Sequence, residues 1–164
     1  MIRSETLKDA SAIARLIEAA FEGVPYSDGS ESGIVARLRA RDALSASLVF
    51  EQDGDIAGHI AFSTITINDE EVPGWFGLAP LSVAPEHQRQ GMGSALAEEG
   101  LRRLQEQGAR GCVVLGEPSY YARFGFVPDG RLQYPGAPAE FFSALRWGDE
   151  ETTGVVAYHP AFDG

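Results

Sequence analysis

Seven consecutive residues have the composition of an anion-binding loop. They follow an apolar, strand-like segment, precede a helical pattern, and read Gln88-Arg89-Gln90-Gly91-Met92-Gly93-Ser94. A helix N-terminus carries unpaired backbone N–H groups and about half a positive charge, so it attracts anions. Glycines let a phosphate approach the backbone closely because they lack a Cβ atom. Arg89 adds a permanent cation and Ser94 a hydroxyl donor, and the loop therefore predicts an anion site.

The spacing of the glycines excludes two common phosphate loops. The chain has no G-x-x-x-x-G-K-[ST] sequence of the Walker type. The third glycine of a dinucleotide-binding fingerprint would fall at position 96, which is Leu96. A Gly-x-Gly pair is also typical of a tight strand-to-helix turn that binds nothing. The two glycines alone leave both interpretations open.

A longer string of residues narrows the choice. The pattern Val83-x-Pro85-x-x-Gln88-Arg89-x-Gly91-x-Gly93-x-x-Leu96 resembles the acetyl-CoA signature of the GNAT superfamily of N-acetyltransferases. The later stretch Gly116–Phe126, in which a tyrosine precedes Arg-Phe-Gly-Phe, is similar to the late segment of that family. Together with the tail Tyr158–Phe162, the chain most resembles the YhbS-like branch of predicted acetyltransferases. The strong matches cover about residues 75–128.

The resemblance implies a mixed α/β fold, a mostly antiparallel central sheet flanked by helices, in which two strands splay apart to bind CoA. The pantetheine arm would lie between the segment around Leu81–Val83 and the strand Cys112–Leu115, pairing with the backbone of Leu81 and Val83. The amides of residues 88–94 would hold the pyrophosphate. The residues expected to contact the cofactor are Leu81, Ser82, Val83, Gln88, Arg89, Gln90, Gly91, Met92, Gly93, Ser94, Tyr120, Tyr121 and Phe124.

Acyl transfer to an amine requires a neutral amine, a stabilised oxyanion and a protonated leaving thiolate. A backbone N–H near Val83 could stabilise the oxyanion, an effect worth several kcal/mol in enzymes. Tyr121 matches the family tyrosine that hydrogen-bonds the CoA sulfur, and a phenol can donate to a thiolate. We expect Tyr121 to be the general acid, with its neighbour Tyr120 as the substitute. Without the motif, Tyr121 would be interpreted as a half-buried core tyrosine.

The general base is not apparent in the sequence. Some family members carry a carboxylate on the strand before the loop, whereas Trp75–Val83 contains none. The base could lie elsewhere, act through water, or be unnecessary if the amine arrives neutral. Glu117 follows the late strand, and His59 has a useful pKa near 6.5. We interpret Glu117 as an exposed loop acid and His59 as a satisfied or exposed strand histidine.

The remaining pattern indicates the elements that position these residues. Apolar residues at helical spacing predict helices from about Thr6 to Phe21, from Ser30 to Ala40, from Gly91 to Gln107 and, briefly, from Ser119 to Phe124. Predicted strands are Ser47–Gln52, Ile56–Ile67, Trp75–Val83, Cys112–Leu115 and Val155–Tyr158. Asp53-Gly54 is a hairpin signal, and Pro80 marks a bulge or an unpaired strand side.

Composition limits the class of protein. The 164 residues suit a single domain spanning 1–164, and the net charge of −11 argues against nucleic acids and anionic membrane surfaces. The single cysteine, Cys112, excludes an internal disulfide, and no histidine or cysteine spacing predicts a metal site. The N-terminus has no signal-peptide pattern, so we expect a cytoplasmic protein. A homodimer is suggested by the resemblance alone.

Three functions fit these observations. The first is an N-acetyltransferase that uses acetyl-CoA and acts on a primary amine, whether a small molecule or a peptide. The second is a GNAT-like domain that binds acyl-CoA but lacks catalysis and serves as a sensor or interaction partner. The third, a nucleotide-phosphate site unrelated to CoA, lacks the lysine of a phosphate-binding loop. By resemblance, residues 22–32 and the late loop 129–150 would select the acceptor.

Overall fold

The computed structural model describes all 164 residues. Its strands are β1 (Ile2–Ser4), β2 (Leu44–Gln52), β3 (Asp55–Ile67), β4 (Glu70–Val83), β5 (Gly111–Leu115), β6 (Leu132–Gln133), β7 (Phe142–Arg146) and β8 (Gly154–Tyr158). Its α-helices are α1 (Ala10–Phe21), α2 (Glu31–Ala40), α3 (Met92–Glu106) and α4 (Pro118–Tyr121). Short 3-10 helices are η1 (Leu7–Asp9), η2 (Pro85–His87), η3 (Ala122–Phe124), η4 (Ala139–Phe141) and η5 (Pro160–Asp163).

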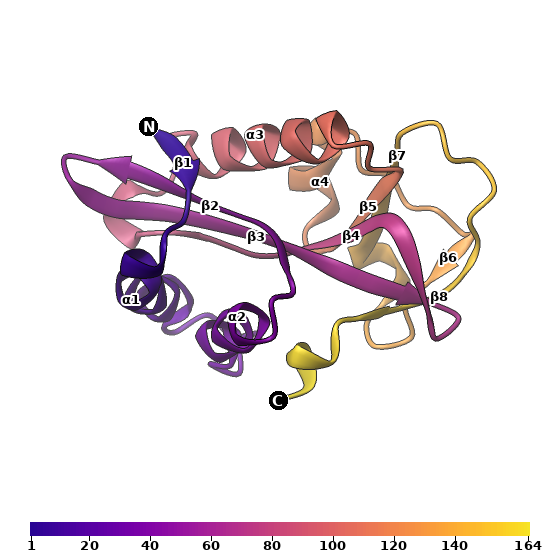
Figure 1. Cartoon of the computed structure of the whole chain (residues 1–164), viewed down its shortest axis with the longest axis horizontal. Helices are drawn as coiled ribbons and strands as arrows, with labels where there is room; N and C mark the ends of the chain where they lie inside the picture. Colours follow the sequence, from indigo (N-terminus) through magenta and orange to yellow (C-terminus); the bar gives the residue numbers. More distant parts are fainter.

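The strands form one mixed sheet of 8 strands in the order β1-β2-β3-β4-β5-β7, with β8 joined to the far end of β3 and to β6. All pairs along the main path are antiparallel except β4 with β5, which is parallel. Helices α3 and α4 lie on one face and α1 and α2 on the other (Figure 1). The predicted fold, a mostly antiparallel sheet flanked by helices, is confirmed.

The largest core lies between the sheet and α3. It is a cluster of 14 buried residues, to which α3 contributes the apolar stripe Met92, Leu96, Ala97, Leu101 and Leu104. These positions recur every three or four residues, so they share one helix face, as the sequence predicted. From β3, Ile60 and Phe62 pack into the same cluster, and Phe62 lies against Gly100 of α3. Burying each large apolar side chain contributes about 2 kcal/mol.

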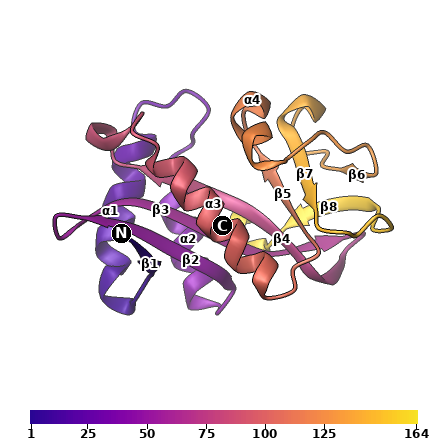
Figure 2. The same ribbon diagram turned by 90° about the horizontal axis from the view of Figure 1, so that it is seen from above.

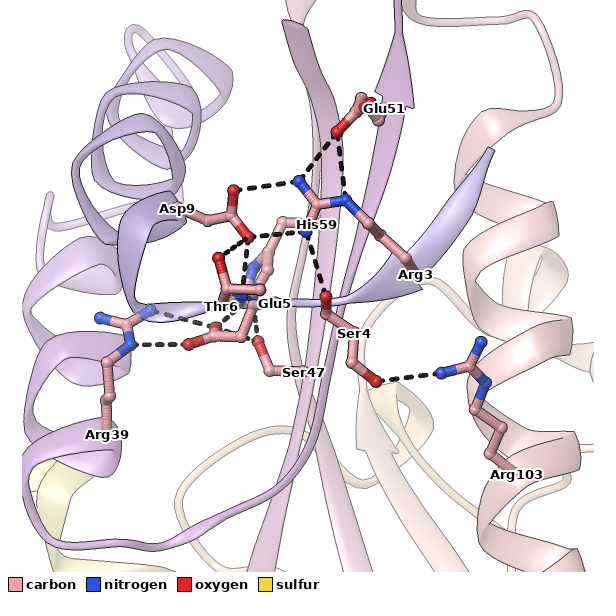
Figure 3. Close-up of polar contacts among 10 residues, drawn as sticks. All are labelled: Arg3, Ser4, Glu5, Thr6, Asp9, Arg39, Ser47, Glu51, His59 and Arg103. Carbon is pink, nitrogen blue, oxygen red and sulfur yellow. Dashed lines mark hydrogen bonds and ion pairs between the residues drawn. The ribbon is translucent and has the colours of Figure 1, made fainter. Parts of the chain in front are cut away.

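The opposite face is held by apolar contacts and by ion pairs. Ile13 and Ile17 of α1 pack on Val35 and Val49 in a small buried cluster. The Arg3 guanidinium donates to the Asp9 carboxylate at 2.8 and 3.1 Å, which ties β1 to η1 (Figure 3). The backbone N–H of Thr6 also donates to Asp9, at 2.7 Å, so that the predicted start of the first helical region at Thr6 is confirmed.

Several elements differ from the sequence prediction. The predicted loop 129–150 contains β6 and β7, and β7 pairs with β5 along its whole length. Strand β7 was missed because its sequence, Phe-Ser-Ala-Leu-Arg, does not alternate cleanly, and β1 and β6 are too short to leave a pattern. The bulge predicted at Pro80 is present, since the register with β3 shifts between Leu78 and Leu81.

Candidate functional site

The parallel strands β4 and β5 separate at one end. Their pairing runs from Trp75 opposite Gly111 to Leu78 opposite Val114 and stops there, although β4 continues to Val83. Strand β3 stays paired with β4 as far as Val83, so only the β5 side of β4 becomes free. Figure 2 shows β5 and β7 running across the direction of β2 to β4. A gap beyond the C-terminal ends of parallel strands is a common ligand site in α/β proteins.

Backbone groups of β4 face this gap. The Ala84 N–H donates to the Ala57 carbonyl of β3 at 2.8 Å. Backbone groups point alternately to the two sides of a strand, so the N–H and C=O groups of Leu81 and Val83 point away from β3 and into the gap. The Val83 carbonyl accepts a hydrogen bond from the Gln88 side-chain amide at 3.1 Å. The remaining groups are directed at any extended chain placed between β4 and β5.

The predicted anion loop closes one end of the gap. Helix α3 begins at Met92, with Gly91 as its N-cap at φ 82°, and its first turn carries no acidic residue. Arg89 also has a positive φ of 64°, a conformation that is uncommon for a residue with a Cβ atom. The Arg89 side chain is exposed at the mouth of the gap. The loop thus presents unpaired N–H groups beside one cation, as an anion site requires.

The two loop glycines are needed for different reasons. Gly91 has open space around it and is required by its backbone angle. Gly93 is required by a close approach, because a Cβ atom there would lie 2.9 Å from the Tyr120 hydroxyl oxygen. The same atom would be 3.6 Å from the Val83 side chain. Gly93 is therefore where α3, α4 and β4 meet.

The structure brings most of the predicted cofactor residues around the gap, with two differences in how they could contribute. The Met92 side chain packs into the core against Gly58, so only its backbone amide is available to a ligand. The Ser82 side chain is buried on the other face of β4, opposite His59 of β3. Leu81, Val83, Tyr121 and Phe124 pack along the edge of the α3 core.

The adjacent tyrosines Tyr120 and Tyr121 occupy opposite ends of the gap. Tyr120 stands over Gly93 at the anion loop, whereas Tyr121 lies against Gly116, just after β5 ends. Their rings meet edge to face with centroids 5.1 Å apart. Burial raises the pKa of Tyr121 above its usual value near 10, and the neighbouring Tyr120 and Tyr26 add to the rise. Tyr121 therefore keeps its proton at neutral pH and can donate it.

One cation of the site was not predicted. Arg123 lies 4.5 Å above the Tyr120 ring, and its guanidinium donates to the Ser94 hydroxyl at 3.4 Å. It thus spans from α4 to the first turn of α3 and adds a second positive charge to that end of the gap. Arg123 stands in the quoted Tyr-Ala-Arg-Phe-Gly-Phe string, and its position two residues after Tyr121 was the available signal.

The two base candidates have different surroundings. Glu117 is exposed and precedes α4, as expected. His59 is fully buried, and only its Nε2 atom has a partner, the Ser47 hydroxyl at 2.8 Å. The expectation of an exposed or fully satisfied histidine was therefore wrong. Its surroundings come from positions scattered between Glu5 and Ser82, so no local pattern could reveal them.

A depression of about 550 Å³ lies on the α1–α2 side. The end of α1, the connecting loop and the start of α2 line it, within the region expected to select an acceptor. Its charged lining residues are Glu18, Glu22 and Glu31, and all three are acids. A cationic molecule would suit this depression better than an anionic one.

Two further searches bear on the class of protein. No helix is long and apolar enough to cross a membrane. No group of three or more histidine, cysteine, aspartate or glutamate side chains could hold a metal ion. Cys112 is buried, and burial raises the pKa of its thiol, so that it remains a thiol at neutral pH.

Comparisons with known proteins agree with this arrangement. The family model for the acetyltransferase (GNAT) domain matches residues 1–128. The uncharacterised N-acetyltransferase YhbS of Escherichia coli K12 is 36% identical over 171 residues, covering 99% of this chain and 98% of YhbS.

Two solved structures are similar over nearly the whole chain. A GNAT family acetyltransferase from Brucella melitensis, in complex with acetyl-CoA, matches with a TM-score of 0.89 and 47% identity, covering 99% of this chain and 97% of that one. YhbS from Escherichia coli, in complex with CoA, matches with a TM-score of 0.90 and 34% identity over 100% of this chain and 92% of that one.

Proposed function

Since the chain belongs to the GNAT acetyltransferases, as its sequence predicted, we propose that it transfers an acetyl group from acetyl-CoA to a primary amine. The observation that carries the proposal is the separation of β4 from β5 after Leu78, between an anion loop and a buried tyrosine. Similar proteins from Brucella melitensis and Escherichia coli bind acetyl-CoA and CoA.

We assign the ends of the gap by chemistry. The pyrophosphate of acetyl-CoA suits the loop of residues 88–94, where Arg89 and Arg123 supply positive charge. The backbone of Leu81 and Val83 suits the amide groups of the pantetheine arm. Such an arm extends from the loop toward the point where β4 and β5 rejoin, which places the thioester near Tyr121. Tyr121 would then donate its proton to the departing thiolate.

The cofactor part of the proposal can be tested by binding alone. Calorimetric titration with acetyl-CoA should give saturable binding to the native chain. An Arg89→Ala, Gly93→Val double variant should lose it, because the cation is removed and a side chain is forced against Tyr120. Arg41→Ala, an exposed arginine at the end of α2, is the control and should bind normally. Folded protein that fails to bind millimolar acetyl-CoA would contradict the proposal.

The catalytic part needs turnover. Thiol release should be followed with an amine panel that includes polyamines and amino-acid amides, because three glutamates line the depression between α1 and α2. Tyr121→Phe should lower kcat about 100-fold, within the range for general acids, and leave the Kd of acetyl-CoA within twofold. Tyr120→Phe is the matched control, and equal losses in both variants would remove Tyr121 from its role.

A second candidate function is a domain that binds acyl-CoA without catalysis. The observation behind it is that Trp75–Val83 has no carboxylate to act as a base. This candidate predicts normal acetyl-CoA binding together with no thiol release by any amine of the panel. The two experiments above therefore separate it from the enzyme.

A further inference from the structure

Four polar atoms are buried without a hydrogen-bond partner in the chain. They are His59 Nδ1, Ser63 Oγ, Ser82 Oγ and the Tyr158 hydroxyl. A buried polar group without a partner costs about 1–3 kcal/mol, so such groups are rare in folded proteins and call for an explanation. The positions of these four atoms suggest one.

All four lie on the sheet face that carries α1 and α2. Along β3, Gly58 and Phe62 face α3, so the alternate residues His59 and Ser63 face the other way. Ser82 is opposite His59 in the pairing of β3 with β4. The ring of Tyr158 covers Gly77, which is opposite Ser63, and a Cβ atom on Gly77 would lie 2.5 Å from that ring. The polar atoms therefore flank β4 on the face opposite the proposed cofactor gap.

The hydrogen bonds around His59 fix which ring nitrogen carries the proton (Figure 3). The Ser47 hydroxyl contacts both the Glu5 carboxylate and His59 Nε2, the latter at 2.8 Å. A carboxylate can only accept, so the single Ser47 proton goes to Glu5 and Nε2–H donates to Ser47. Nδ1 is then a bare lone pair, directed away from this chain of bonds.

Glu5 is held in its charged form. Burial opposes its ionisation, but bonds from the His59, Arg39 and Ser47 side chains outweigh burial and lower the pKa of Glu5 to about 2. The Arg39 guanidinium donates to the carboxylate at 2.7 and 3.1 Å. A carboxylate two bonds from Nε2–H stabilises the imidazole if it gains a second proton, as in other acid–histidine pairs.

The groups that face His59 come from every neighbouring element. Glu5 precedes η1, Arg39 belongs to α2, Ser47 to β2 and Ser82 to β4, while α1 buries only apolar residues. Burial lowers the pKa of His59, and the charge of Arg39 adds to this, against the opposing effect of Glu5. The imidazole is therefore neutral and able to accept a proton at pH 7.

We propose that His59 is the proton acceptor for the amine, and that the proton reaches it through the Ser82 hydroxyl. Ser82 is suited to this because its side chain adjoins His59 while its neighbours Leu81 and Val83 turn their backbone groups into the gap. The inference rests on the proposed acetyl transfer. It supplies the base that the sequence of β4 lacks.

The step balances as follows. A C–N bond forms between the amine and the acetyl carbon, and the C–S bond to CoA breaks. The amine proton passes to Ser82 Oγ while the Ser82 proton passes to His59 Nδ1, and the thiolate takes the Tyr121 proton. Afterwards the imidazolium releases a proton to solvent and the phenolate takes one up. The net products are an N-acetylated amine and CoA with its thiol.

The test compares His59→Gln and Ser82→Ala with a histidine control, His159→Gln, whose ring caps η5. Thiol release is followed from pH 5 to 9 with an amine from the panel, or with water as nucleophile if no amine reacts. We expect His59→Gln to lower kcat at least 100-fold, to remove the acidic limb of the pH profile, and to change the Kd of acetyl-CoA less than twofold. His159→Gln should keep that limb.

Ser82→Ala protects the test against misfolding of the His59 variant. Its hydroxyl has no partner, so its removal should leave Tm unchanged or raised while kcat falls at least tenfold. Ser63→Ala, another unpartnered hydroxyl, is the matched control for Tm. Wild-type kcat in Ser82→Ala, or an unchanged acidic limb in His59→Gln, would overturn the proposal.

A spectroscopic measurement is independent of turnover. Long-range ¹H–¹⁵N NMR of the native chain at pH 7 should show His59 neutral with its proton on Nε2, with or without acetyl-CoA. A proton on Nδ1, or a charged ring, would contradict the inference even in an active enzyme. Failure to bind acetyl-CoA, or binding without any thiol release, would instead contradict the proposed function.

Discussion

The two faces of the sheet are packed in different ways. The α3 face buries one apolar cluster of 14 residues, and every polar contact of the cofactor gap lies at its margin. The α1–α2 face has smaller apolar clusters of 4 and 3 residues, interrupted by buried Ser47, His59, Ser63 and Ser82. The first face is built for stability and for holding a ligand, whereas the second accepts a cost in stability to keep polar groups inside the protein.

The comparison predicts unequal losses for equal truncations. Ile60 faces α3 and Ile17 belongs to α1, and both are essentially inaccessible to solvent. We expect Ile60→Ala to lower the free energy of unfolding by about 4 kcal/mol and Ile17→Ala by about 2 kcal/mol, both within the range for buried isoleucines. The smaller cluster can relax around the missing side chain. Equal losses in chemical denaturation would break the comparison.

Glu5→Gln tests the polar face by charge. We expect a loss of about 2 kcal/mol at pH 7, because Arg39 and the Ser47–His59 pair lose their charged partner. The folded-state pKa of Glu5, about 2, lies below its ordinary value of 4.5. Its contribution is therefore complete above about pH 4.5 and is lost as pH falls toward 2.

The pH dependence of unfolding sharpens this prediction. Between pH 4.5 and 2 the native chain should lose more stability than Glu5→Gln, and the two curves should converge at the acidic end. Glu51→Gln removes a more exposed partner of Arg3 and should shift stability by less than about 1 kcal/mol. Parallel curves for the native chain and Glu5→Gln would mean that Glu5 is not held ionised by the fold.

The smallest effect is expected at the margin of the cofactor gap. Arg123→Ala should raise the Kd of acetyl-CoA about three- to fivefold, since an exposed cation beside a helix N-terminus contributes about 1 kcal/mol to anion binding. The same titration with Arg41→Ala should match the native chain. A Kd that is insensitive to Arg123 would leave Arg89 as the principal cation of the site.

The sequence revealed the α3 face far better than the other one. The loop Gln88–Ser94, the stripe on α3 and Tyr121 all lie within about forty consecutive positions, and local spacing there reflects local structure. Glu5, Arg39, Ser47, His59 and Ser82 meet only because β2, β3 and β4 pair in a particular register. Such register is a property of the folded sheet, and no spacing along the chain encodes it visibly.

The same contrast explains the missed strands. Strand β7 forms because β5 offers it a complete antiparallel edge, from Gly111 opposite Arg146 to Leu115 opposite Phe142. Its own residues do not require a strand. The splay between β4 and β5 was expected from resemblance, and its limits at Leu78 and Val114 came only from the pairing.

The position of Tyr158 over Gly77 has a consequence for biosynthesis. The residues around the cofactor gap, from Leu81 to Phe126, leave the ribosome before β8, the strand that carries this tyrosine, has been made. At translation rates of about 5–20 residues per second, the delay is on the order of seconds. A nascent chain would thus complete its cofactor cleft first, with Gly77 and Ile65 still uncovered, and close its acceptor face last.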